Sequence, residues 1–102
     1  MYKNSPLISV IINCHNGEKY LEKSVRSVIR QTYKNWEIIF WDNRSTDNSK
    51  KIIKSFNDKR IKYFKSKKYS TLYKARNIAI KKAKGKYIAF LDTDDWWYKT
   101  KL

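Results

Sequence analysis

The chain has 102 residues, of which 24 are Lys or Arg and 9 are Asp or Glu, giving a formal net charge of +15. This length forms one modest domain, residues 1–102, and the 41% hydrophobic content argues against a disordered chain. The longest apolar runs are too short to span a bilayer, and the lone Cys14 excludes a disulfide framework. Residues 1–13 lack the long apolar segment and cleavage site of a signal peptide, so we expect a cytoplasmic protein.

The positive charge leaves three interpretations open. It could be a Lys-rich solvated surface, a surface that attracts anionic lipids or phosphorylated substrates, or a nucleic-acid interface. Lysine supplies most of the charge and is spread over the whole chain, whereas recognition of base edges and phosphates favours Arg. Nucleic acid is therefore the least favoured partner, while a position at the inner face of an anionic membrane stays an alternative.

The first half of the chain alternates between two hydrophobic periods. The apolar runs at 8–13 and 36–41 predict buried strands. Between them, segment 17–31 repeats apolar residues at helical spacing, and Glu18 and Arg30 lie where a helix dipole favours an acid and a base. A second helix follows, for which the N-cap candidates are Ser45, Thr46 and Asp47 and the core face is Ile52, Ile53 and Phe56.

The second half continues the same alternation. Residues 60–65 predict a short strand, and small or apolar residues from Leu72 to Ala83 predict a helix that Gly85 can end at its C′ position. Residues 86–91 form the fourth strand candidate. The order βαβαβαβ predicts an α/β fold, a Rossmann-like parallel sheet flanked by helices.

Parallel sheets bind ligands beyond the carboxyl ends of their strands. Polar residues follow the first, second and fourth predicted strands, so we expect one site at that edge of the sheet. Those residues are Asn13, Cys14, His15 and Asn16, then Asp42, Asn43, Arg44 and Ser45, then Asp92, Thr93, Asp94 and Asp95.

The acidic cluster DTDD is the most specific of these signals. Neighbouring carboxylates repel unless a cation joins them, and oxygen ligands suit Mn²⁺ or Mg²⁺. The alternative is that the three acids are solvated in a turn or cap a helix near Trp96. Trp96 and Trp97 could stack on a ring or begin a hydrophobic core, and core is the favoured interpretation.

Only Gly17 and Gly85 are present, so neither a Walker motif nor a dinucleotide fingerprint can be written. A bound phosphate would need a metal and cationic side chains. Arg76 is the candidate cation, although an arginine on a helix is often only a surface residue. His15 is the single histidine, which argues against a His-rich metal site, and it could equally cap its loop.

The chain resembles the N-terminal half of family 2 glycosyltransferases, which have the GT-A nucleotide-sugar fold. The resemblance runs from Pro6 to Trp97 and rests on three segments in the family's order. They are PLISVIINCHNGEKYLEKSVRSVIRQTYKNWEII, WDNRSTDNS and ARNIAIKKAKGKYIAFLDTDD. Each motif alone is weak, and their joint occurrence is specific.

The resemblance implies roles at the matching positions. Asn13, His15 and Asn16 are implied base contacts, and Glu18 lies near that pocket. Asp42, with Asn43 beside it, contacts the base or ribose. Arg76 and Asn77 lie near the diphosphate, Asp92 and Asp94 belong to the nucleotide-sugar site, and Asp94 and Asp95 hold the metal, with Asp95 as the direct ligand.

The implied reaction is transfer of a sugar from a nucleotide diphosphate donor, UDP first among them, to a hydroxyl acceptor with inversion. The acceptor could be a glycan, a lipid-linked sugar or a protein, as in polysaccharide synthesis. The metal neutralises the leaving diphosphate.

This sequence departs from the family pattern in several places. Asn43 replaces an acid, and Arg44 and Thr71 stand where glycine is common. The acceptor-binding half and the general base are expected beyond Leu102, so we expect donor binding without turnover, and self-association into a homo-oligomer through the uncovered edge. The competing interpretations are a basic module that binds nucleic acid or anionic membrane without catalysis, and a scaffold that only oligomerises.

Overall fold

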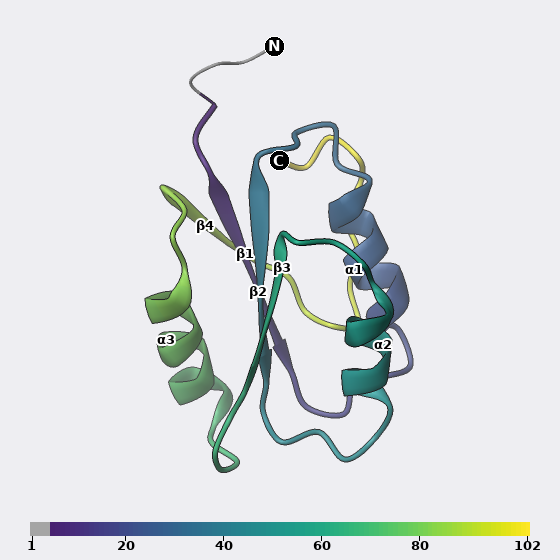
Figure 1. The fold of residues 1–102 in the computed structure, drawn as a ribbon, viewed down its shortest axis with the longest axis vertical. Helices are drawn as coiled ribbons and strands as arrows, with labels where there is room; N and C mark the ends of the chain where they lie inside the picture. Colours follow the sequence, from purple (N-terminus) through teal and green to yellow (C-terminus); the bar gives the residue numbers. More distant parts are fainter. Residues whose placement is uncertain (1–4) are drawn as a thin grey trace.

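The structure is a computed structural model and describes residues 5–102. Four strands and three helices alternate along the chain (Figure 1). They are β1 (Ile8–Cys14), α1 (Leu21–Ile29), β2 (Trp36–Asp42), α2 (Ser49–Ser55), β3 (Ile61–Lys65), α3 (Leu72–Lys82) and β4 (Tyr87–Phe90). Every strand pair is parallel, and the sheet order is β3-β2-β1-β4. The predicted Rossmann-like α/β class is therefore confirmed.

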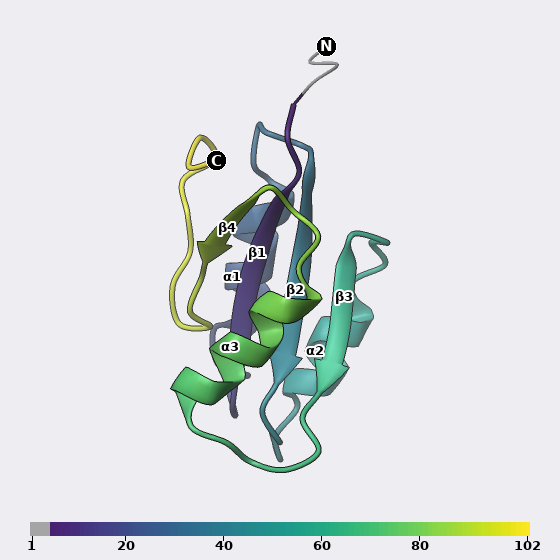
Figure 2. The same ribbon diagram turned by 90° about the vertical axis from the view of Figure 1, so that its left-hand side faces the viewer.

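Helices cover both faces of the sheet, with α1 and α2 on one side and α3 on the other (Figures 1 and 2). The strand pleat divides the core accordingly, because successive side chains point to opposite faces. Val10 and Ile12 of β1 join the larger apolar cluster beneath α1 and α2. Ile11 joins a smaller cluster beneath Ala75 and Ala79 of α3.

The order of the strands places a switch point beside β1. The chain moves from β1 outward to β2 and β3, then returns through α3 to form β4 on the other side of β1. The loops that leave β1, β2 and β4 therefore meet at the carboxyl edge of the sheet, where such folds bind ligands. Among residues 5–102, none of the helices has the length and apolar content that crossing a membrane would require.

The first helix is shorter than predicted. It begins at Leu21 rather than near Gly17, so Glu18 precedes the helix, and Glu22 and Arg26 take the positions expected of Glu18 and Arg30. The reason is close packing at the sheet edge. A Cβ on Gly17 would lie 2.7 Å from the Oγ1 of Thr93, so this segment lies against the DTDD loop rather than winding into the helix.

Two predicted helix boundaries also differ. The N-cap of α2 is Asn48 rather than Ser45, Thr46 or Asp47, although the Oδ1 of Asp47 accepts the first helical N–H, that of Ser49, at 2.9 Å. Gly85 is no left-handed C′ residue, since no glycine of residues 5–102 has a positive φ. Instead its N–H donates to the Oγ of Ser9 at 2.8 Å, and a Cβ there would lie 2.5 Å from that oxygen.

The edge strand β4 is sparsely covered. Tyr87, Ile88 and Phe90 are exposed although they lie in a strand. Apolar side chains on an open strand edge favour association. The self-association expected from the sequence remains a prediction.

Candidate functional site

Two adjoining hollows open at the carboxyl edge of the sheet, and we call them together the edge cleft. The larger has a volume of about 460 Å³ and is lined by Asn13, Asn16, Gly17, Lys19, Tyr20, Leu72, Asp92, Thr93 and Asp94. The smaller, of about 90 Å³, is lined by Asn13, Cys14, His15, Asn43, Tyr69 and Leu72. Asn13 and Leu72 line both, so the hollows share a wall.

Asn16 ties the loop after β1 to the loop after β2. Its Oδ1 accepts the backbone N–H groups of Thr46 at 2.7 Å and Asp47 at 3.2 Å, and its own N–H donates to the Oγ of Ser45 at 2.9 Å. Asn16 has a φ of 55°, a left-handed conformation that asparagine tolerates better than most residues. This wall of the larger hollow is therefore fixed before any ligand arrives.

Asp42 is buried and lines neither hollow of the edge cleft. Its carboxylate is buried, with Oδ1 accepting the N–H of Ser45 at 2.9 Å and Oδ2 accepting the hydroxyl of Tyr63 at 2.6 Å. Burial, and then the hydrogen bond to Asp42, raise the pKa of Tyr63 well above its usual value. Arg44 in the same loop has a φ of 60°, so it adopts the left-handed turn for which the family uses glycine.

Asn43 holds the segment that closes the smaller hollow. Its Nδ2 donates to the carbonyl of Ser70 at 2.6 Å, and its Oδ1 accepts the N–H of Ser70 at 3.0 Å. The carbonyl of Asn43 lies 2.7 Å from the Nδ1 of His15, whose ring meets the edge of Tyr69 with centroids 4.8 Å apart. Asn43 thus positions His15 and Tyr69, and its side chain amide is already satisfied.

Asn13, which lines both hollows, carries an unsatisfied donor. Its Nδ2 is buried and has no hydrogen-bond partner among residues 5–102. A buried polar group without a partner is costly, so a ligand that brings an acceptor to this atom gains a hydrogen bond and removes that cost. The neighbouring thiol of Cys14 is less available, since burial raises its pKa.

The DTDD loop is held by its backbone and presents its acids outward. The Oγ of Ser24, on α1, donates to the carbonyl of Thr93 at 2.9 Å and contacts that of Asp95. The carboxylates of Asp92, Asp94 and Asp95 are all exposed. Asp92 pairs with Arg76 at 3.3 Å, while Asp95 accepts the N–H of its neighbour Trp96 at 2.8 Å.

The acids of the DTDD loop are the candidate metal ligands of this edge. Within residues 5–102, no three His, Cys, Asp or Glu side chains converge closely enough to form a closed site. Mg²⁺ and similar hard cations, however, take one or two carboxylates and complete their coordination with water and substrate phosphate. Asp92 and Asp94 line the larger hollow and offer such oxygens, so the residues present fit an open site.

The structure brings together six of the residues predicted from the sequence. Those lining the edge cleft are Asn13, His15, Asn16, Asn43, Asp92 and Asp94. Arg76 joins only through its ion pair with Asp92. Glu18, Asn77 and Asp95 are exposed and line neither hollow, and the buried Asp42 lines neither as well.

Ser24, Tyr63 and Tyr69 were missed by the sequence analysis. Ser24 did give a signal, because it is a polar residue beside Leu21 and Val25 on the buried face of α1. Tyr63 and Tyr69 gave none, since their contacts join segments that lie far apart in the sequence.

The fold and the cleft define an α/β domain whose carboxyl edge carries polar and acidic groups. The chain belongs to glycosyl transferase family 2, whose profile matches residues 9–102. It is 42% identical over 96 residues to UDP-Glc:alpha-D-GlcNAc-diphosphoundecaprenol beta-1,3-glucosyltransferase WfgD of Escherichia coli, covering 94% of this chain and 38% of that protein. The corresponding E. coli enzyme WfaP is 46% identical, with the same coverage.

A solved relative shares the fold closely. The structure of S. aureus TarS in complex with UDP-GlcNAc superposes with a TM-score of 0.86 at 31% identity, over 90% of this chain and 28% of that one. This chain therefore spans about two fifths of the two curated relatives' length and less of TarS. The family suggested by the sequence motifs is confirmed.

Proposed function

We propose that this chain forms the donor-binding part of a glycosyltransferase that uses a UDP-sugar. The supporting relatives are WfgD, which is named for UDP-Glc, and TarS, which was crystallised with UDP-GlcNAc. The observation that carries the proposal is the shared wall of the edge cleft. Asn13 places an unsatisfied donor between a small hollow and a larger hollow that is lined by carboxylates.

The smaller hollow suits the nucleobase. Asn13 Nδ2 can donate to a ring carbonyl, and His15 and Tyr69 offer aromatic surface beside it. Asn43 fixes both aromatic residues, His15 through its carbonyl and Tyr69 through the neighbouring Ser70. A preorganised pocket loses less conformational entropy on binding.

The larger hollow suits the diphosphate and sugar. In this proposal, Asp92 and Asp94 hold Mn²⁺ or Mg²⁺, and Arg76 orients Asp92 through their ion pair. The metal, when bound, supplies positive charge for the leaving diphosphate. Asp95, the ligand implied by the resemblance, lines neither hollow, and it could join through its Oδ2 because the N–H of Trp96 occupies only its Oδ1.

The proposed reaction is inverting transfer of the sugar to a hydroxyl on a lipid-linked acceptor. WfgD and WfaP are both named for an acceptor joined to undecaprenol through a diphosphate. We assign none of the described residues as the acceptor's general base. Donor binding, rather than turnover, is therefore the property to test in these 102 residues.

Isothermal titration with UDP, in the presence of Mn²⁺, tests the proposal. Asn13→Ala should weaken binding by about tenfold, because a buried hydrogen bond contributes about 1 kcal/mol or more. Asn57→Ala is the matched control, since this exposed asparagine between α2 and β3 lines neither hollow, and it should bind like the wild type. Equal affinity of the Asn13 variant and the wild type, or no UDP binding at all, would overturn the proposal.

A further inference from the structure

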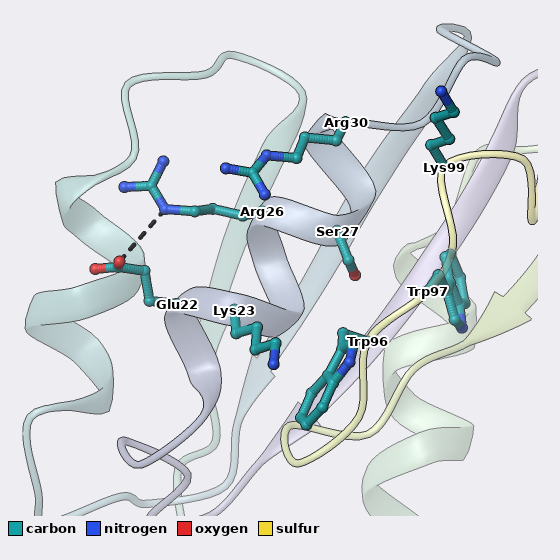
Figure 3. A pocket seen from close by; sticks show the side chains of 8 residues that line it. All are labelled: Glu22, Lys23, Arg26, Ser27, Arg30, Trp96, Trp97 and Lys99. Carbon is teal, nitrogen blue, oxygen red and sulfur yellow. Dashed lines mark hydrogen bonds and ion pairs between the residues drawn. The ribbon is translucent and has the colours of Figure 1, made fainter.

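A second cleft lies between α1 and the C-terminal segment that carries Trp96 and Trp97. Its volume is about 320 Å³, and we call it the basic cleft (Figure 3). Lys23 and Arg26 of α1 and Arg30 at its C-cap form one wall, and Trp96, Trp97 and Lys99 of the C-terminal segment form the other. None of these residues belongs to the edge cleft.

The charge of the basic cleft is strongly one-sided. Lys23, Arg26 and Arg30 follow at spacings of three and four, which places them on one face of the helix. Glu22 is the single acid in the lining, and its pair with Arg26 at 3.3 Å is largely exposed and therefore weak. No ion pair within residues 5–102 involves Arg30 or Lys99. Four cations against one acid leave this surface free to meet an anionic partner.

The two tryptophans differ in their packing. Trp97 is partly buried against the main core, while Trp96 is 42% exposed. The Nζ of Lys23 lies 3.7 Å from the centroid of the Trp96 ring. An exposed indole beside cations suits the head-group layer of a membrane, where its apolar body and polar N–H both find partners.

The wall that carries these indoles is fixed in place. Gln31 is fully buried, and its Nε2 donates to the carbonyl of Tyr98 at 2.6 Å while its Oε1 accepts the N–H of Leu102 at 2.9 Å. The N–H of Thr32 donates to the carbonyl of Lys99 at 2.8 Å. The basic cleft is therefore preformed, and binding there requires little ordering of the backbone.

We propose that the basic cleft is the face through which this protein docks on an anionic lipid bilayer, with lipid phosphates at Lys23, Arg30 and Lys99 and with Trp96 in the head-group layer. The proposal extends the proposed function in one respect, because a lipid-linked acceptor lies in a membrane. The two clefts are neighbours, since the ring of Tyr20, which lines the edge cleft, lies 6.0 Å from that of Trp96. A bilayer that contacts Trp96 would therefore lie beside the donor.

Vesicle sedimentation tests whether the cations of the basic cleft drive membrane binding. The assay uses phosphatidylglycerol–phosphatidylcholine vesicles at 0.15 M salt without nucleotide. Each basic residue near an anionic leaflet strengthens binding about fivefold, so the double variant Lys23→Gln/Arg30→Gln should bind about 25-fold more weakly. The matched control is Lys81→Gln/Lys82→Gln on α3, across the sheet. Charges beyond a Debye length of about 8 Å are screened, so the control should lose less than about threefold.

Tryptophan fluorescence tests the position of the indole. On adding the same vesicles, the wild-type emission should shift to the blue and be quenched by brominated lipids, and Trp96→Phe should remove both effects. Soluble inorganic diphosphate and single-stranded RNA serve as competitors. Neither should displace the protein from vesicles at concentrations that match the lipid phosphate.

Three results would overturn the docking proposal. They are an equal loss of vesicle affinity in the two double variants, an unchanged blue shift of the emission of Trp96→Phe, and displacement of the protein from vesicles by diphosphate or RNA. Failure of UDP titration, by contrast, would leave vesicle binding untouched, because the vesicle assay contains no nucleotide. The two proposals can therefore fail separately.

Discussion

The two sides of the edge cleft are built in opposite ways. On the β1–β2 side, the polar groups of Asn16, Asp42 and Asn43 hydrogen-bond to the protein itself. On the β4 side, the side chains of Asp92 and Asp94 are exposed, with Asp92 paired to Arg76, and Ser24 holds the backbone of the loop. Apart from the unpaired Nδ2 of Asn13, the first side has its polar groups satisfied without a ligand, and the other side offers its carboxylates outward.

Because of this difference, substitutions on the two sides should affect different properties, the stability of the fold on one side and ligand binding on the other. Substitutions on the β1–β2 side should lower the free energy of unfolding, because they leave buried groups without partners. Substitutions of the exposed acids should leave stability nearly unchanged and should act on metal and donor binding.

The largest expected effect is that of Asp42→Ala. It removes the partner of the Tyr63 hydroxyl and of the Ser45 N–H at a buried position, so the free energy of unfolding should fall by about 3 kcal/mol. Asp94→Ala, at an exposed position, is the control and should change it by less than about 0.5 kcal/mol. Urea denaturation measures both, and similar losses would remove the proposed contrast.

Gly17→Ala should destabilise the contact between the two sides. The added Cβ would lie 2.7 Å from the Oγ1 of Thr93 and 2.8 Å from its Cβ, which a short β-branched side chain cannot avoid. Overpacking of this kind costs about 2 kcal/mol. Lys19→Ala, an exposed change two residues away, should be nearly neutral in the same denaturation series. A fully stable Gly17→Ala protein would show that the two loops are not in contact.

Ser24→Ala should have a smaller effect. It removes the side chain that holds the carbonyls of Thr93 and Asp95, at a cost of about 1 kcal/mol. Ser55→Ala is the matched control, because this exposed serine bonds only within its own helix, to the carbonyl of Ile52. If both variants lose the same stability, the link from α1 to the DTDD loop does not contribute.

The smallest effect is confined to alkaline pH. The pKa of Tyr63 is higher in the folded protein than in the unfolded chain, where it is near 10. The stability that the Tyr63 hydroxyl contributes is therefore complete below pH 10 and is lost as the pH rises through the pKa of the folded state. The difference in unfolding free energy between wild type and Tyr63→Phe should therefore be constant from pH 7 to 9 and should narrow above pH 10. A difference that stays constant through pH 11 would contradict the bond between Tyr63 and Asp42.

Local sequence patterns predicted the strands and the edge of the sheet that carries the site. Continuous apolar runs such as 8–13 and 36–41 indicate buried parallel strands. Polar residues that directly follow such strands meet at the carboxyl edge of the sheet. This reasoning placed Asn13, His15 and Asp94 correctly in one cleft.

Contacts between distant segments could not be read from the sequence. The bonds from Ser24 to the DTDD loop and from Asn43 to Ser70 join residues at least 27 positions apart. The roles of Gly17 and Gly85 were not predicted for the same reason. They depend on close contacts with Thr93 and Ser9, which are distant in sequence, rather than on local turn geometry. The burial of Asp42 and its bond to Tyr63 also gave no local signal, because Tyr63 lies on another strand.

The central claim is that a UDP-sugar and a divalent metal meet at Asp92 and Asp94 in the edge cleft. Paramagnetic broadening of NMR amide signals by Mn²⁺, measured with and without UDP, tests it most directly. We predict that the signals of Thr93 and Asp94 broaden strongly only when UDP is present, while that of Ile53, buried in α2, is unaffected. Broadening that ignores UDP, or that is centred away from the DTDD loop, would contradict the proposed site.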